Sequence, residues 1–299
     1  MEIDRQDISF PSEGDTLRGW LYGPRTPSGP CPAIVMAHGF GAVKEMYLDR
    51  FAEVFAAAGF VVLVFDYRRL GASDGVPRQE IDPMAQVEDY RNAITWIAAR
   101  DEVDPARIGV WGTSYSGGHV LVLAATDPRV KCVVSQVPTI SGNAVTRRRF
   151  TPQALDALVE TQAKDRLARM QGALPQTRLL VSDIADGRAV YTAPDAVEWY
   201  ESAAARGGAW RNEVTLRSLE YSRAYEPGAW VSFIAPTPLL MIVADRDSVT
   251  PTDLALGAYE QAREPKSLAM IPGGHFAAYT AAFDAASAAA RDWFVRFLR

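Results

Sequence analysis

The sequence predicts a doubly wound α/β fold, with a mostly parallel sheet and an inserted, mainly helical cap. Short apolar runs typical of buried strands alternate with helical segments in the first and last parts of the chain. This alternation stops near Pro138 and resumes only at Pro238, and the pattern between them is helical and amphipathic with no buried strand. We therefore expect one core, formed by residues 1–138 and 236–299, that is split by a cap at residues 139–235.

The first strands divide into two kinds. Ile8–Phe10 and Leu17–Tyr22 alternate apolar and polar residues around a polar turn, which predicts a hairpin with one solvated face. Ala33–Ala37 and Phe60–Phe65 are apolar throughout, as strands covered on both faces of a parallel sheet are. A helix from about Tyr47 to Ala58 is predicted between them.

The rest of the core keeps the same alternation of strand and helix. The further elements predicted are a helix over Pro83–Ala99, a strand over Ile108–Trp111, a helix after Ser114, strands over Cys132–Val137 and Leu239–Ala244, a helix over Thr252–Ala262, a strand over Ser267–Ile271 and a closing helix over Phe276–Leu298.

Composition excludes several classes of protein. A chain of 299 residues that is 48% hydrophobic can bury a large core, so disorder is not expected. A net charge of -5 argues against a nucleic-acid or membrane-surface partner. The only basic run, Arg147–Arg149, is expected to be a solvated turn rather than an anion site.

Two further observations concern location and cofactors. Cys31 and Cys132 fit neither a disulfide framework nor a metal motif, and both are expected to be core residues. The first residues lack a secretory pattern, and no apolar run approaches the ~18 residues needed to span a bilayer. A cytoplasmic protein without a metal or organic cofactor is expected.

The stretch Gly112–Gly118 carries the strongest chemical signal. A short strand enters a Gly-Thr-Ser-Tyr-Ser-Gly-Gly turn that is followed by a helix, which places Ser114 at a strand-to-helix corner. A serine held there in a sharp turn exposes its hydroxyl beside the positive end of a helix. Ser116 occupies a small position where glycine is usual. The alternative is a glycine-rich turn that binds an anion or only reverses the chain.

A nucleophilic serine needs a base and a group that orients this base. Of the three histidines, His38 opens a glycine-rich loop and His119 lies within the helix after Ser114, so His275, in a turn after a buried strand, is the expected base. The orienting acid is Asp247 or Asp245. We favour Asp247 because it lies farther into its turn, whereas Asp245 adjoins the strand.

The order Ser114, Asp247, His275 is the order found in α/β-hydrolases. The chain resembles that superfamily over nearly its whole length, and within it the dienelactone-hydrolase-like and Xaa-Pro-dipeptidyl-peptidase-like serine hydrolases. The motifs that carry the resemblance are His38–Gly41, Asp66–Gly75, Gly112–Gly118, Asp247–Pro251 and Gly273–Phe276.

The resemblance implies a serine-hydrolase mechanism. Ser114 attacks a carbonyl, His275 accepts its proton and Asp247 orients the imidazole. The backbone N–H groups of Phe40 and Tyr115 are implied to form the oxyanion hole. The family's Gly-x-x-Asp before the acid is here Ala244-x-x-Asp.

The predicted cap is rich in aromatic residues, which suit the cover of an apolar pocket. Trp199, Tyr200 and Trp230 are expected to contact substrate, although such residues also build a cap's own core. The aromatic residues in question are Phe150, Tyr191, Trp199, Tyr200, Trp210, Tyr221, Tyr225 and Trp230.

The sequence therefore predicts hydrolysis of a small-molecule acyl substrate, namely a carboxylic ester, lactone or thioester. Acyl transfer to an alcohol or amine uses the same triad and stays open. A peptidase is a further alternative, disfavoured because the cap shows no acidic cluster for an amino terminus. A non-catalytic protein on a degenerate fold would be favoured by a missing triad member, and none is missing. Whether the chain forms a homo-oligomer is left open.

Overall fold

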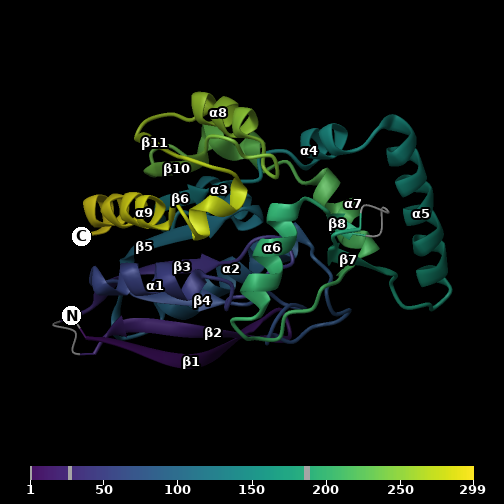
Figure 1. Cartoon of the computed structure of the whole chain (residues 1–299). Coiled ribbons are helices and arrows are strands. Elements are labelled where there is room, and N and C mark those ends of the chain that lie inside the picture. Colours follow the sequence, from purple (N-terminus) through teal and green to yellow (C-terminus); the bar gives the residue numbers. More distant parts are fainter. Residues whose placement is uncertain (1, 26–28, 185–188) are drawn as a thin grey trace.

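An eight-stranded sheet with helices on both faces organises the chain (Figure 1). The computed structural model describes residues 2–25, 29–184 and 189–299. The strand order is β1-β2-β4-β3-β5-β6-β10-β11, with β1 and β2 antiparallel at one edge and parallel pairing from β4 to β11. The strands are β1 (Ile3–Ser12), β2 (Asp15–Pro24), β3 (Cys31–Ala37), β4 (Val61–Phe65), β5 (Val103–Thr113), β6 (Val130–Gln136), β10 (Leu239–Ala244) and β11 (Lys266–Ile271).

The N-terminal hairpin is confirmed, with longer strands than predicted. β1 and β2 are joined by Glu13 and Gly14, whose φ angles of 48° and 89° are both positive. Two such residues form the type I′ turn, whose twist matches that of the strands it joins. The edge of the sheet is therefore a tight antiparallel ribbon.

Helices cover both faces of the sheet, which is the doubly wound arrangement that was predicted. Contacts place α1 and α9 on one face and α2, α3 and α8 on the other. No helix within the described ranges is long and apolar enough to cross a bilayer. These helices are α1 (Leu48–Ala57), α2 (Pro83–Ala98), α3 (Tyr115–Thr126), α8 (Thr252–Gln261) and α9 (Phe283–Leu298).

One predicted helix was wrong in its extent. The segment expected to be a single helix over Phe276–Leu298 is a short 3₁₀ helix, η2 (His275–Tyr279), followed by α9. His275 and Tyr279 are buried, and their side chains hydrogen-bond to other elements of the core. These tertiary bonds fix a tighter turn than the sequence pattern indicated.

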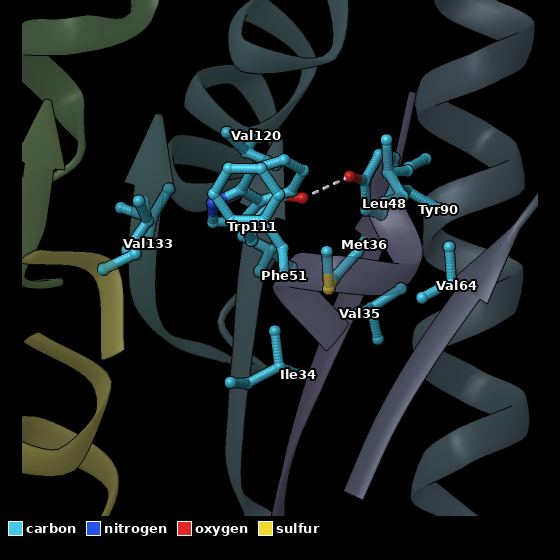
Figure 2. Packing of buried hydrophobic residues seen from close by; sticks show 14 of the residues in the cluster. Ile34, Val35, Met36, Leu48, Phe51, Val64, Tyr90, Trp111, Val120 and Val133 are labelled. Carbon is cyan, nitrogen blue, oxygen red and sulfur yellow. Dashed lines mark hydrogen bonds between the residues drawn. The ribbon is translucent and has the colours of Figure 1, made fainter. Parts of the chain in front are cut away.

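Trp111, on the central strand β5, is among the largest fully buried side chains of the core (Figure 2). Its indole is fully buried, with the ring of Phe51 from α1 4.8 Å away. The hydroxyl of Tyr90 from α2 donates a 2.7 Å hydrogen bond to the Trp111 carbonyl (Figure 2). Helices from both faces thus hold the strand that leads to Ser114.

Of residues 139–235, the described elements between residues 142 and 224 lie toward one side of the molecule, and both termini lie at the opposite side (Figure 1). The expectation of no buried strand in this segment was wrong, because Leu180 and Val181 are buried in a small sheet of order β8-β7-β9. The Asn212 side chain bonds both the N–H and the carbonyl of Val181, which stabilises strands too short to give a sequence signal. The elements are α4 (Gly142–Arg149), α5 (Pro152–Met170), β7 (Thr177–Val181), β8 (Ala189–Tyr191), α6 (Pro194–Ala204), β9 (Val214–Thr215), α7 (Leu216–Ala224) and the 3₁₀ helix η1 (Pro227–Phe233).

Candidate active site

Ser114 lies in a strained turn between β5 and α3. Its φ of 59° and ψ of -116° lie outside the regions that ordinary residues favour. A Cβ on Gly112 would stand 2.2 Å from the Ser116 carbonyl oxygen, so this position requires glycine. Ser116 fits the last small position because its buried hydroxyl meets the hydroxyls of Tyr67 and Tyr90, each at 3.0 Å.

His275 connects Ser114 to a carboxylate. Its Nε2 is 2.9 Å from Ser114 Oγ, and its Nδ1 is 2.7 Å from Asp247 Oδ2. The His275 and Asp247 side chains are almost fully buried. With Nδ1–H donating to the carboxylate, Nε2 is left as the acceptor for the serine hydroxyl. The structure therefore brings together the three residues that the sequence selected.

The two candidate acids occupy different surroundings. Asp247 Oδ1 accepts the N–H groups of Val249 and Thr250 at 2.9 and 2.8 Å, which leaves Oδ2 for His275. Asp245 is half exposed and accepts the N–H of Gly273 at 2.8 Å. Asp247, and not Asp245, therefore faces the imidazole.

Two threonines that sequence reasoning missed fix the acid's loop. Thr252 Oγ1 donates to the Ala244 carbonyl at 2.7 Å and accepts the Asp247 N–H at 3.0 Å, which bridges the loop where the family's glycine is replaced. Thr250 Oγ1 lies 2.9 Å from Asp247 Oδ2 and 3.1 Å from His275 Nδ1. The sequence feature that could have identified them is the threonine on each side of Pro251, directly after Asp247-Ser-Val.

The loop that begins at His38 lies directly against the nucleophile. A Cβ on Gly39 would stand 2.9 Å from Ser114 Cβ, so glycine is needed for this approach. The ring of Phe40 meets that of Tyr115 edge to face at 5.2 Å. Tyr115 is the first residue of α3, so its N–H has no acceptor within the helix and lies at the helix's positive end.

The aromatic residues expected to contact substrate lie elsewhere, which corrects that expectation. Tyr200 is buried and donates a 2.6 Å hydrogen bond to the Phe40 carbonyl. Trp199 is buried with its ring stacked on Phe276 at 5.0 Å. Trp230, 41% exposed, lines a separate surface hollow. Trp199 and Tyr200 pack residues of 139–235 against the core, and Trp230 lies at the surface. Large aromatic side chains are suited to such packing contacts.

A second indole contact supports the same loop. Trp210 Nε1 donates to the carbonyl of Gly41 at 2.9 Å, and its ring stacks on that of Tyr200. Two consecutive carbonyls of the loop, those of Phe40 and Gly41, are therefore held by side chains from 139–235. These aromatic residues position the loop.

A cavity of about 120 Å³ opens beside Ser114. It is roofed by residues of 139–235, including Phe150 and Tyr191, and its lining is mostly apolar. The cavity is lined by Phe40, Ser114, Tyr115, Thr139, Gly142, Val145, Thr146, Arg149, Phe150, Leu158, Arg178, Ala189, Val190, Tyr191, Leu219, Ser222, Arg223, Val249 and Thr250.

The basic run Arg147–Arg149 is solvent-exposed, as expected, but it is helical and not a turn. It forms the last turn of α4, where cations are favoured by the helix dipole. Arg148 makes a bidentate pair with Asp253 at 2.7 Å, and Arg149 lines the cavity.

The other two histidines, His38 and His119, are buried and take no part in the hydrogen bonds that join Ser114, His275 and Asp247. His119 accepts the Tyr225 hydroxyl at Nδ1 and donates from Nε2 to Gln86, and burial lowers its pKa to about 3, so it is neutral. It is the satisfied helix histidine that was predicted. His38 bonds the Gly39 carbonyl, and burial lowers its pKa also. No group of metal-ligating side chains occurs in the part of the chain that the structure describes.

Comparison with known proteins identifies the family of the chain. A family model described as X-Pro dipeptidyl-peptidase (S15 family) matches residues 13–277. The quorum-quenching protein AidA of Acinetobacter baumannii is 38% identical over 275 residues, covering 91% of this chain and 88% of that protein. A thiohydrolase of Eupenicillium brefeldianum is 32% identical over 277 residues, covering 91% and 87%.

A solved structure extends the similarity to three dimensions. The crystal structure of the α/β hydrolase GrgF from Penicillium sp. sh18 superimposes with a TM-score of 0.85 at 29% identity, covering 99% of each chain. Among curated proteins, GrgF of Penicillium sp. is named a polyketide transferase, 31% identical over 275 residues, covering 91% of this chain and 90% of that protein. The fold is thus that of α/β hydrolases, and the chain is an enzyme of the hydrolase type.

Proposed function

We propose that this chain, which belongs to the X-Pro dipeptidyl-peptidase (S15) family, is a serine esterase that cleaves a carboxylic ester, lactone or thioester. The observation that carries the proposal is the unbroken hydrogen-bond chain from Ser114 through His275 to Asp247 beside a covered cavity. The name of the thiohydrolase relative supports the choice of ester or thioester over peptide.

In the first half-reaction Ser114 Oγ attacks the substrate's carbonyl carbon, and its proton passes to His275 Nε2. Asp247 stabilises the imidazolium that forms. The N–H groups of Phe40 and Tyr115 donate to the oxyanion. The bond from the carbonyl carbon to the leaving oxygen or sulfur then breaks, and His275 gives its proton to that atom. The product of this half is an acyl-enzyme on Ser114 and an alcohol or thiol, which is released from an ester or thioester and stays part of the acyl group when the substrate is a lactone.

In the second half-reaction water attacks the acyl carbon and gives its proton to His275. The bond to Ser114 Oγ breaks, the serine regains a proton from His275, and a carboxylic acid leaves. Residues 139–235 act as the cap in this proposal, because they roof the cavity and limit the entry of water.

Acyl transfer is the second candidate, and the similarity to a polyketide transferase favours keeping it. An alcohol or amine would then replace water in the second half-reaction. We propose water as the usual acceptor. The test is to incubate the enzyme with an activated acyl ester and graded alcohols or amines, and to quantify free acid and transfer product by mass spectrometry. Dominant transfer at acceptor concentrations far below that of water would overturn the hydrolase assignment.

The nucleophile itself is tested by Ser114→Ala, with Ser116→Ala as the matched control in the same turn. Ser114→Ala should abolish labelling by a fluorophosphonate and lower kcat by on the order of 10⁶. Ser116→Ala keeps Ser114 and should still be labelled. Circular dichroism checks that both variants fold. Labelling of Ser114→Ala at the wild-type rate would remove Ser114 as the nucleophile.

A further inference from the structure

Basic side chains from separate segments line the cavity that holds Ser114. Arg149 ends α4 and Arg223 lies in the last turn of α7, and Arg178 of β7 joins the same lining. Among the described residues, no aspartate or glutamate lines this cavity.

Arg223 has a donor without an acceptor. Its Nη1 atom is buried and makes no hydrogen bond to any described residue. A buried donor left unpaired carries a desolvation penalty, which is larger for a charged group. An oxygen of a bound molecule would remove this penalty.

Arg149 also lacks a carboxylate partner within the described ranges. Its guanidinium lies over the ring of Tyr191, 4.9 Å from the ring centre. Its neighbour Arg148 differs, because Asp253 neutralises that side chain outside the cavity. Arg149 and Arg223 therefore bring two positive charges to the cavity without a carboxylate from the described residues to offset them.

We propose that Arg149 and Arg223 bind a carboxylate of the substrate, so that the enzyme prefers esters or thioesters carrying an ionised carboxylate away from the scissile carbonyl. This inference rests on the proposed function of Ser114. Guanidinium groups match carboxylates in geometry and make charge-assisted bonds to them. The apolar lining, which includes Val145, Leu158 and Leu219, takes the hydrocarbon chain between the two polar ends.

A purely hydrocarbon acyl group fits this lining less well. It would displace water from the cavity and leave Arg223 Nη1 buried without an acceptor. A substrate with one carboxylate satisfies this donor and keeps the apolar contacts. The cavity is thus built for an amphiphilic substrate.

The experiment compares matched esters on the wild-type enzyme. The neutral ester is 4-nitrophenyl hexanoate, and mono-4-nitrophenyl adipate has the same acyl length with a terminal carboxylate. A second pair, 4-carboxyphenyl hexanoate and its methyl ester, places the carboxylate on the leaving group. For the pair with the correctly placed carboxylate, we expect the ratio of kcat/KM, charged over neutral, to favour the charged ester by on the order of 10- to 100-fold.

Variants assign this preference to the two arginines. Arg223→Met and Arg149→Gln should each lower the charged-to-neutral ratio of kcat/KM by about tenfold or more. Arg147→Gln is the control, because Arg147 is exposed on the same helix, does not line the cavity, and bonds Asn143 among the described residues. If Arg223→Met does not fold, Arg223→Gln takes its place and Arg149→Gln gives the same readout.

The outcomes separate the two proposals. No turnover of either neutral ester, together with no phosphonate labelling of Ser114, is the failure of the proposed function. Turnover of a neutral ester without a preference for either charged one, or a preference unchanged in both arginine variants, would overturn the carboxylate site alone. A preference that both variants reduce and Arg147→Gln preserves would establish it.

Discussion

Asp247→Asn tests the geometry of the acid most directly. Asp247 Oδ1 accepts two backbone N–H groups, from Val249 and Thr250, at 2.9 and 2.8 Å. An asparagine must keep its carbonyl oxygen at that position, since its NH₂ cannot accept these bonds. The NH₂ group then takes the place of Oδ2, 2.7 Å from His275 Nδ1.

This orientation of the asparagine changes the tautomer of the His275 imidazole. A donor at the Oδ2 position requires Nδ1 to accept, so the ring's proton moves to Nε2, which faces Ser114 Oγ at 2.9 Å. The serine then has no base. We expect kcat for an acyl ester to fall by on the order of 10⁴, with the fold retained, because only the tautomer changes.

Asp245→Asn is the matched control two residues away. Asp245 accepts the Gly273 N–H at 2.8 Å, and an asparagine oxygen can still accept this bond. We therefore expect less than about a tenfold loss of kcat. Both variants are assayed by initial rates on the same ester, and thermal melts show that both fold. A larger loss for Asp245→Asn than for Asp247→Asn would refute the assignment of the acid.

Two further predictions concern positioning and pH. Tyr200→Phe removes the hydroxyl that holds the Phe40 carbonyl, so kcat should fall about 2- to 10-fold with KM nearly unchanged, and a change confined to KM would contradict this role. His119→Gln tests how stability depends on pH. An unfolded histidine binds a proton below pH ~6.5, whereas burial keeps His119 neutral in the folded protein until pH about 3. As pH falls through this window, His119 therefore lowers the free energy of unfolding by up to about 1.4 kcal/mol per pH unit. Urea unfolding at several pH values should show a shallower dependence in the variant, and an equal slope would exclude His119 as the titrating group.

The geometry of the candidate site could be predicted because parallel strands end at one edge of the sheet. Ser114 follows β5, Asp247 follows β10 and His275 follows β11, so local motifs at three strand ends suffice to bring them together. The continuous apolar runs identified these strands without any tertiary information. The sequence could not predict whether the Asp247 loop keeps its shape with Ala244 in place of the family's glycine, because that shape depends on the hydrogen bonds of Thr252.

The cavity could not be predicted in the same way. Arg149 and Arg223 belong to helices far apart in the sequence, and no local pattern relates them. The short strand β7 and the role of Tyr200 were missed for the same reason, since both depend on contacts between 139–235 and other segments. Aromatic composition indicated a cover for the site, but not which rings face the cavity.

Under the proposed function, residues 139–235 couple substrate binding to the chemistry at Ser114. The same segment supplies Arg149 and Arg223 to the cavity and the Tyr200 hydroxyl that holds the Phe40 carbonyl. Phe40 carries one of the N–H groups that we assign to the oxyanion. A substrate carboxylate that orders this segment therefore also orders the oxyanion loop, so part of its binding energy is used in the transition state. Under the proposed mechanism, loss of the carboxylate lowers kcat as well as raising KM.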